Sequence, residues 1–176
     1  MRYRILILSA VAVTALAAAA TAVAGTITTT ATITGTAGLS LNLPSTASIS
    51  DTLDGTDQTV TYAPVLGVVD ARGTGAGWNL TVNATNFSDG AGHTLAPGTV
   101  TGVTQACKSG STCTAATNAV TYPLTITGTA AKVFNAAANT GLGKVDVTPT
   151  ISVAIPGNTY TGTYTSTVTV AAASGP

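Results

Sequence analysis

The sequence is poor in the residues that most enzymes and nucleic-acid-binding proteins use. It contains no glutamate, one histidine, one tryptophan and two cysteines, and only 7% of its residues are charged. One histidine and six aspartates leave little material for a catalytic triad, a zinc site or a paired-carboxylate acid and base. Scarce basic residues supply no positive patch for nucleic acid. We therefore expect a protein that is neither an enzyme nor a nucleic-acid binder, without a cofactor or a metal.

An apolar run opens the chain after two arginines. Arg2 and Arg4 precede the run, which closes on the small-x-small triplet Ala22-Val23-Ala24. This order is typical of a secretory signal peptide, so we expect residues 1–24 to be removed on export. An uncleaved anchor is the alternative, but the run is alanine-rich and barely reaches the ~18 to 20 residues that spanning requires. After cleavage, residues 25–176 would have no membrane association.

The remaining chain has the composition of a β protein. Threonine makes up about a fifth of the residues, and valine, isoleucine, alanine and glycine fill most of the rest. We predict a single all-β domain over residues 25–176, a β-sandwich of which the immunoglobulin-like type is one form, with a barrel as the alternative. The expected strands are Ile27–Thr34, Leu39–Leu43, Gln58–Val69, Trp78–Ala84, Gly98–Val103, Ala119–Thr127, Ala130–Ala136, Asp146–Ala154 and Thr159–Ala171.

Two segments have a competing interpretation. Residues 26–36 are threonine-rich enough for a low-complexity stalk, although the alternation of Ile27 and Ile33 with threonines favours a strand. Residues 130–139 contain several helix-forming alanines, but Val133 and Phe134 favour a strand there.

Three aspartates and the histidine are residue types that bind metal ions, but their sequence context does not favour a metal site. Asp51, Asp54 and Asp57 recur at three-residue spacing, which does not match the alternate ligands of an EF-hand, so a solvated turn is favoured over calcium binding. His93 lies in an expected loop and is interpreted as a surface residue.

Both cysteines lie close together, in Cys107-Lys-Ser-Gly-Ser-Thr-Cys113. In an oxidising compartment we expect them to form a disulfide. Closing so short a loop contributes only ~2.4 kcal/mol in the chain-entropy model. The bridge would pin a loop tip without holding up the fold.

The run from Val68 to Val82 contains the single tryptophan and one of the few basic residues that follow the apolar leader. In the strand that follows its glycines, Trp78, Leu80 and Val82 share one face, which predicts that Trp78 is a core residue; an exposed ring that stacks on a glycan is the alternative. Asp70 and Arg72 would face the same way. They form a local ion pair, or Arg72 binds a carboxylate of a peptidoglycan stem peptide.

This run resembles the signature of WxL-domain proteins, secreted surface proteins of Gram-positive bacteria. In that signature an acidic-x-Arg-Gly segment and a glycine-rich turn precede Gly-Trp-x-Leu. The corresponding residues here are Asp70, Arg72, Gly73, Gly77, Trp78 and Leu80.

A second family motif, Tyr-x-x-x-Leu-Thr-Trp-x-Leu, has a partial counterpart near the end of the chain. Tyr164 and Thr169 agree with it, whereas Val168, Val170 and Ala172 replace leucine, tryptophan and leucine. The lost second tryptophan bears on wall binding more than on the fold.

The resemblance implies a noncatalytic protein at the cell surface that associates noncovalently with peptidoglycan or another wall polymer. Its site residues would be those of the two motifs, and other surface proteins are further candidate partners. The alternative is a structural subunit of a surface layer or pilus-like fibre, because weakly charged, threonine-rich strands offer little to block pairing at sheet edges.

Overall fold

The computed structural model describes residues 28–35 and 38–176, so the expected signal peptide at residues 1–24 lies outside it. Within these ranges all regular structure is β-strand, and no helix long and apolar enough to cross a membrane is found. Residues 33–176 form one compact unit. Its strands are β1 (Leu39–Asn42), β2 (Gln58–Tyr62), β3 (Leu66–Asp70), β4 (Trp78–Ala84), β5 (Phe87–Ser88), β6 (Thr94–Leu95), β7 (Thr99–Cys107), β8 (Leu124–Thr125), β9 (Ala131–Ala136), β10 (Gly143–Ile155) and β11 (Val168–Ser174).

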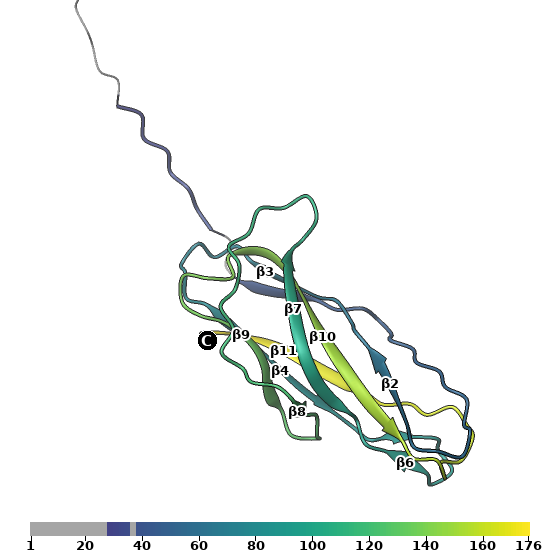
Figure 1. Cartoon of the computed structure of the whole chain (residues 1–176). Helices are drawn as coiled ribbons and strands as arrows, with labels where there is room; N and C mark the ends of the chain where they lie inside the picture. Colours follow the sequence, from purple (N-terminus) through teal and green to yellow (C-terminus); the bar gives the residue numbers. More distant parts are fainter. Residues whose placement is uncertain (1–27, 36–37) are drawn as a thin grey trace, which may run out of the picture. The chain divides into compact units, whose positions relative to one another are not determined.

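All strand pairs are antiparallel and form two main sheets (Figure 1). The larger sheet has the order β1-β3-β10-β7-β8, and β2 also pairs with β10. The smaller sheet has the order β11-β4-β9, and β5 and β6 form a separate hairpin. Strand β10, 13 residues long, organises the larger sheet, since β3 and β2 pair with its successive halves on one side and β7 pairs on the other.

The core lies between the two sheets, which confirms the predicted sandwich. Alternate side chains of β3 and β10 are buried from the larger sheet, and those of β4 from the smaller one, as a period of two residues requires. Trp78, Phe134 and Leu80 are the largest fully buried side chains, and they belong to one continuous apolar cluster.

The predicted strands are confirmed where the alternating pattern meets a partner. Trp78–Ala84 is observed as β4, and the prediction of a strand at residues 130–136 is confirmed by β9, so the helical alternative for that segment is wrong. A bulge explains why Val133 and Phe134 are both buried: Leu80 pairs with Phe134 and Thr81 pairs with Lys132, which leaves Val133 as the extra residue.

Other strand predictions are wrong or too long. Residues 28–34, expected to be in a strand, pair with nothing among the described residues, and Ile33 is 93% exposed. The expected strand over residues 58–69 is two strands, because Pro64 lies between them and cannot donate to a ladder. The expected strand over residues 159–171 forms regular structure only from Val168, and the short β5 and β6 were not expected.

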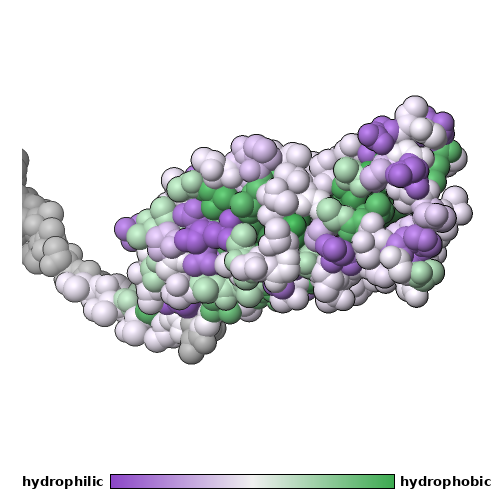
Figure 2. Space-filling model, turned by 90° about the horizontal axis from the view of Figure 1, so that it is seen from below, coloured by the Kyte–Doolittle hydropathy of each residue, from purple (hydrophilic) through white to green (hydrophobic). Residues whose placement is uncertain are grey.

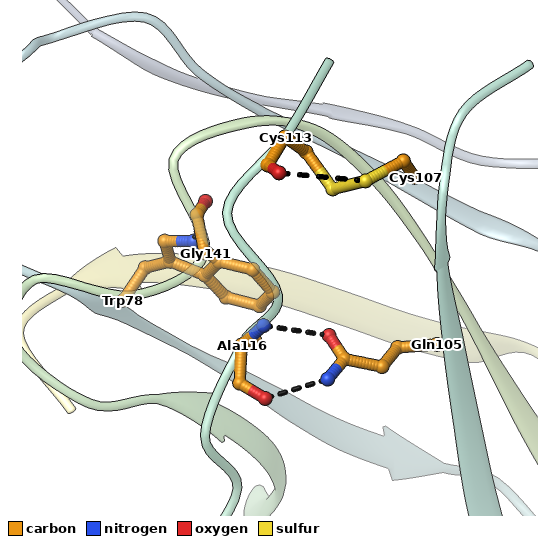
Figure 3. The surroundings of a disulfide bond; sticks show 6 residues. All are labelled: Trp78, Gln105, Cys107, Cys113, Ala116 and Gly141. Carbon is orange, nitrogen blue, oxygen red and sulfur yellow. Dashed lines mark hydrogen bonds between the residues drawn. A yellow bond between two sulfur atoms is a disulfide. The ribbon is translucent and has the colours of Figure 1, made fainter. Parts of the chain in front are cut away.

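The long connection from β7 to β9 holds only β8, although residues 119–127 were expected to form a strand. Side-chain amides replace the ladder there. Asn135 Oδ1 accepts a hydrogen bond from the Ala119 N–H at 2.9 Å, and Asn118 Oδ1 accepts one from the Asn135 N–H at 3.0 Å. Gln105 pairs with both backbone groups of Ala116, which anchors the start of this connection to β7 (Figure 3).

The expected disulfide between Cys107 and Cys113 is present (Figure 3). It joins the end of β7 to the start of the connection. The same region is also held by the backbone, since the Thr114 N–H donates to the Leu142 carbonyl at 2.9 Å.

We expect the double substitution Cys107→Ser/Cys113→Ser to lower the free energy of unfolding by no more than about 2.4 kcal/mol. The variant should stay folded, because backbone and Gln105 hydrogen bonds hold the connection independently of the bridge. Urea unfolding curves of the two proteins check this, with reduced wild type as a control. A variant that is unfolded in buffer would contradict the expectation.

Candidate functional site

The first motif lies at one end of the sandwich, where the chain passes from the larger sheet to the smaller one. Asp70 is the last residue of β3 and Trp78 is the first residue of β4. The connection between them contains the motif's arginine and glycines. The chain end lies against it, since the Gly175 N–H donates to the Gly77 carbonyl at 3.1 Å.

Arg72 ties these segments together. Its Nε and Nη2 donate to Oδ1 and Oδ2 of Asp70, each at 2.8 Å, in a bidentate ion pair. Nη2 also donates to the Gly77 carbonyl at 2.8 Å, and Nη1 donates to Oγ of Ser174 in β11. Four of the five N–H groups of the guanidinium therefore have partners within the protein.

The ion pair is largely removed from water, with the Asp70 side chain fully buried and that of Arg72 13% exposed. Hydrogen bonds from Arg72 lower the pKa of Asp70, and the same bonds raise the pKa of Arg72. Between the two interpretations of this pair, the geometry supports the internal ion pair. The guanidinium has little hydrogen-bonding capacity left for a stem-peptide carboxylate.

Trp78 is buried in the core, as the alternation predicted, and does not form an exposed stacking surface. Its ring packs against Phe134 at a centroid distance of 5.6 Å. Its Nε1 donates to the Gly141 carbonyl at 2.9 Å, and Figure 3 shows Gly141 next to the indole. Gly141 has a φ of 70°, and a Cβ there would lie 2.7 Å from Trp78 Nε1. A residue with a side chain at this position would displace the indole. Leu80, the next inward residue, is also fully buried.

The residues of the second motif do not join the first as one cluster. Tyr164 lies before β11, near the end of the sandwich opposite Trp78, where its hydroxyl donates to the Tyr160 carbonyl at 3.0 Å. Thr169 is exposed on β11, paired with Asn83. Val170 and Ala172, where the family motif has tryptophan and leucine, are the half-buried residues of β11.

A groove of about 500 Å³ reaches between the sheets at the place where β11 has valines and the family motif has leucine and tryptophan. Val168 and Val170 of the smaller sheet line it, as do residues 43–49. Figure 2 shows apolar surface in two separate areas of the face it presents, each bordered by hydrophilic residues.

The aspartates near Gly55 each cap a local turn or a neighbouring loop. Asp51 accepts from the Thr52 N–H, Asp54 accepts from Thr56, and Asp57 accepts from the Gly157 N–H. In the part of the chain that the structure describes, no three potential ligands among histidine, cysteine and aspartate are grouped to hold a metal ion.

Sequence reasoning missed a polar and aromatic cluster at the far end. His93 was interpreted as a plain surface residue, but its ring stacks on that of Tyr160, with centroids 3.9 Å apart, and its Nδ1 hydrogen-bonds Asp89. Asp89 and His93 are four residues apart, which was the one local signal. The distance in sequence to Tyr160 hid the stacking partner.

We expect Asp70→Asn to lower the free energy of unfolding at pH 7 by about 3 kcal/mol, because Arg72 loses the anion that compensates its partly buried charge. The folded-state pKa of Asp70 is depressed, so its stabilising effect is complete above the unfolded value of about 3.9 and disappears as the pH falls through the folded pKa. The difference between wild type and variant should therefore shrink below pH 4.

Urea unfolding at pH 7 and pH 3 measures both effects. Asp51→Asn, at an exposed turn, is the matched control and should follow the wild-type curve. A difference between wild type and Asp70→Asn that does not change with pH would contradict the ion-pair account.

A scan against protein-family models matches residues 42–172 to the WxL domain, described as a surface cell-wall-binding domain. Searches of curated proteins and of solved structures found no match. The matched residues cover most of the chain and include the ion pair, the buried tryptophan and the part of β11 up to residue 172. Because the family model matches well over half of the chain, the chain belongs to the WxL family of cell-wall-binding surface domains.

Proposed function

We propose that this chain is a noncatalytic domain, exported by means of residues 1–24, that associates noncovalently with the peptidoglycan of the cell wall. The observation that carries the proposal is the family match over residues 42–172. The geometry assigns the motif residues a role inside the domain: Asp70, Arg72 and Trp78 fix how the strands meet. Polymer contact then falls to the exposed surface that these residues hold in shape.

The exposed chemistry suits the sugar chains of peptidoglycan better than the carboxylates of its stem peptides. Hydroxyl groups outnumber charges at the outward positions of the strands, among them those of Thr101 and Thr104 of β7, Thr125 of β8 and Thr169 of β11. Such hydroxyls donate and accept hydrogen bonds with sugar hydroxyl groups. Arg72, whose charge is neutralised by Asp70, adds little to an electrostatic attraction for anionic polymers.

Co-sedimentation with purified peptidoglycan tests this proposal. We expect saturable binding that persists at high salt, because few charges are involved, and that is lost when a muramidase has digested the walls. Trp78→Phe keeps an aromatic ring in the core but removes buried volume and the hydrogen bond to Gly141, so it should lower the melting temperature and still bind when folded. Wild type that stays in the supernatant at all wall concentrations would overturn the proposal.

A second candidate function is assembly by strand-edge pairing, and it rests on β11. This strand hydrogen-bonds β4 on one side, and no described strand pairs with its other side. Its sequence, Val-Thr-Val-Ala-Ala-Ala-Ser, contains neither a charge nor a proline, the usual devices that protect an edge.

If β11 pairs between copies, light scattering should rise with protein concentration, and Ala171→Lys should abolish the rise by placing a charge at an exposed edge position. Thermal melts should show the variant to be as stable as wild type. Wild type that remains monomeric at millimolar concentration would rule this candidate out.

A further inference from the structure

A cleft of about 570 Å³ lies at the far end of the domain from Trp78. It is built around the last residues of β10 and bounded by two exposed segments, residues 49–53 and residues 159–164. Apolar side chains, including Phe87, Leu95 and Ile155, line it together with several hydroxyls and the carboxylate of Asp51. Its volume is within the range of about 300 to 1,000 Å³ that small-molecule sites occupy.

The aromatic ring of Tyr160 lines this cleft, and a stacked histidine holds it in position. Tyr160 lines the cleft and is 65% exposed, although its ring stacks on that of His93 at 3.9 Å with an interplanar angle of 18°. The stack covers one face of the tyrosine ring. The remaining exposure belongs to the other face and the edge.

His93 is itself held in place. Its Nδ1 hydrogen-bonds one carboxylate oxygen of Asp89, and the other oxygen accepts the N–H groups of Ala91 at 2.8 Å and His93 at 3.0 Å. The Tyr164 hydroxyl donates to the carbonyl of Tyr160 and fixes the backbone beneath the ring. This chain of contacts lowers the entropy that the ring would lose when a ligand stacks on it.

The combination matches the chemistry of a saccharide. The C–H face of a sugar ring packs on an aromatic ring, while its hydroxyls require donors and acceptors such as threonine hydroxyls and a carboxylate. Thr161 and Thr163 supply hydroxyls beside Tyr160, and Asp51 supplies the carboxylate. Within the described residues, no lysine, arginine or histidine lines the cleft, which disfavours an anionic polymer.

We propose that this cleft binds a neutral glycan segment, with Tyr160 as the stacking platform and Asp51 and the threonine hydroxyls as its polar partners. The apolar side chains would accommodate the methyl groups of N-acetylated sugars. The identification of the glycan as the peptidoglycan strand rests on the proposed function. The saccharide specificity rests on the cleft itself.

The test is a calorimetric titration of the exported protein with the β-1,4-linked tetramer of N-acetylglucosamine. Co-sedimentation with whole peptidoglycan is measured in parallel. Tyr160→Ala should weaken tetramer binding at least about tenfold, because the stacked ring is lost. Tyr160→Phe keeps the ring and should bind within about twofold of wild type. Val65→Ala, an exposed apolar truncation outside the cleft, should bind as wild type does.

The outcomes separate the cleft from the wall-binding proposal. Loss of both tetramer and wall binding in Tyr160→Ala alone, with an unchanged melting temperature, supports the cleft. Wall binding that is equal in wild type and Tyr160→Ala, with no affinity for the tetramer, overturns the cleft and leaves the proposed function intact. Tyr160-dependent tetramer binding without wall binding supports the saccharide cleft and overturns peptidoglycan as its source.

Discussion

The guanidinium of Arg72 is the group on which the motif end of this sandwich depends. It contacts the last residue of β3 in the larger sheet, the carbonyl that precedes β4, and the last residue of β11 in the smaller sheet. Asp70 is buried, and a buried carboxylate without a cation would be expensive. The two residues therefore act as one unit, which holds two sheets and the chain end in register.

In this chain the signature residues have a structural role. Trp78 is the single tryptophan of the sequence. Its ring lies in the core against Phe134, and its Nε1–H donates a hydrogen bond to the Gly141 carbonyl. The signature describes how the domain is built at one end. The opposite end, around Tyr160 and Asp51, has the open cleft and the exposed ring from which the glycan site is proposed.

Several features could be predicted because they depend on neighbours in the sequence. The alternation after Gly77 placed Trp78 and Leu80 in the core, and the short cysteine spacing predicted the disulfide. Residues 28–34 and 119–127 show the limit of such patterns. A threonine-rich sequence favours a strand, but a strand also needs a partner to pair with. In the connection that contains residues 119–127, side chains such as that of Asn118 make the hydrogen bonds instead.

The sequence by itself determined the all-β class, the inward face of β4, the likeness to the WxL family and the disulfide, because each depends on residue type and short spacing. Only the tertiary structure decided that Arg72 is bonded internally, that the two motifs lie apart, and that His93 supports Tyr160. These outcomes depend on contacts between segments distant in the chain, and no local pattern encodes which of them meet when the two sheets pack.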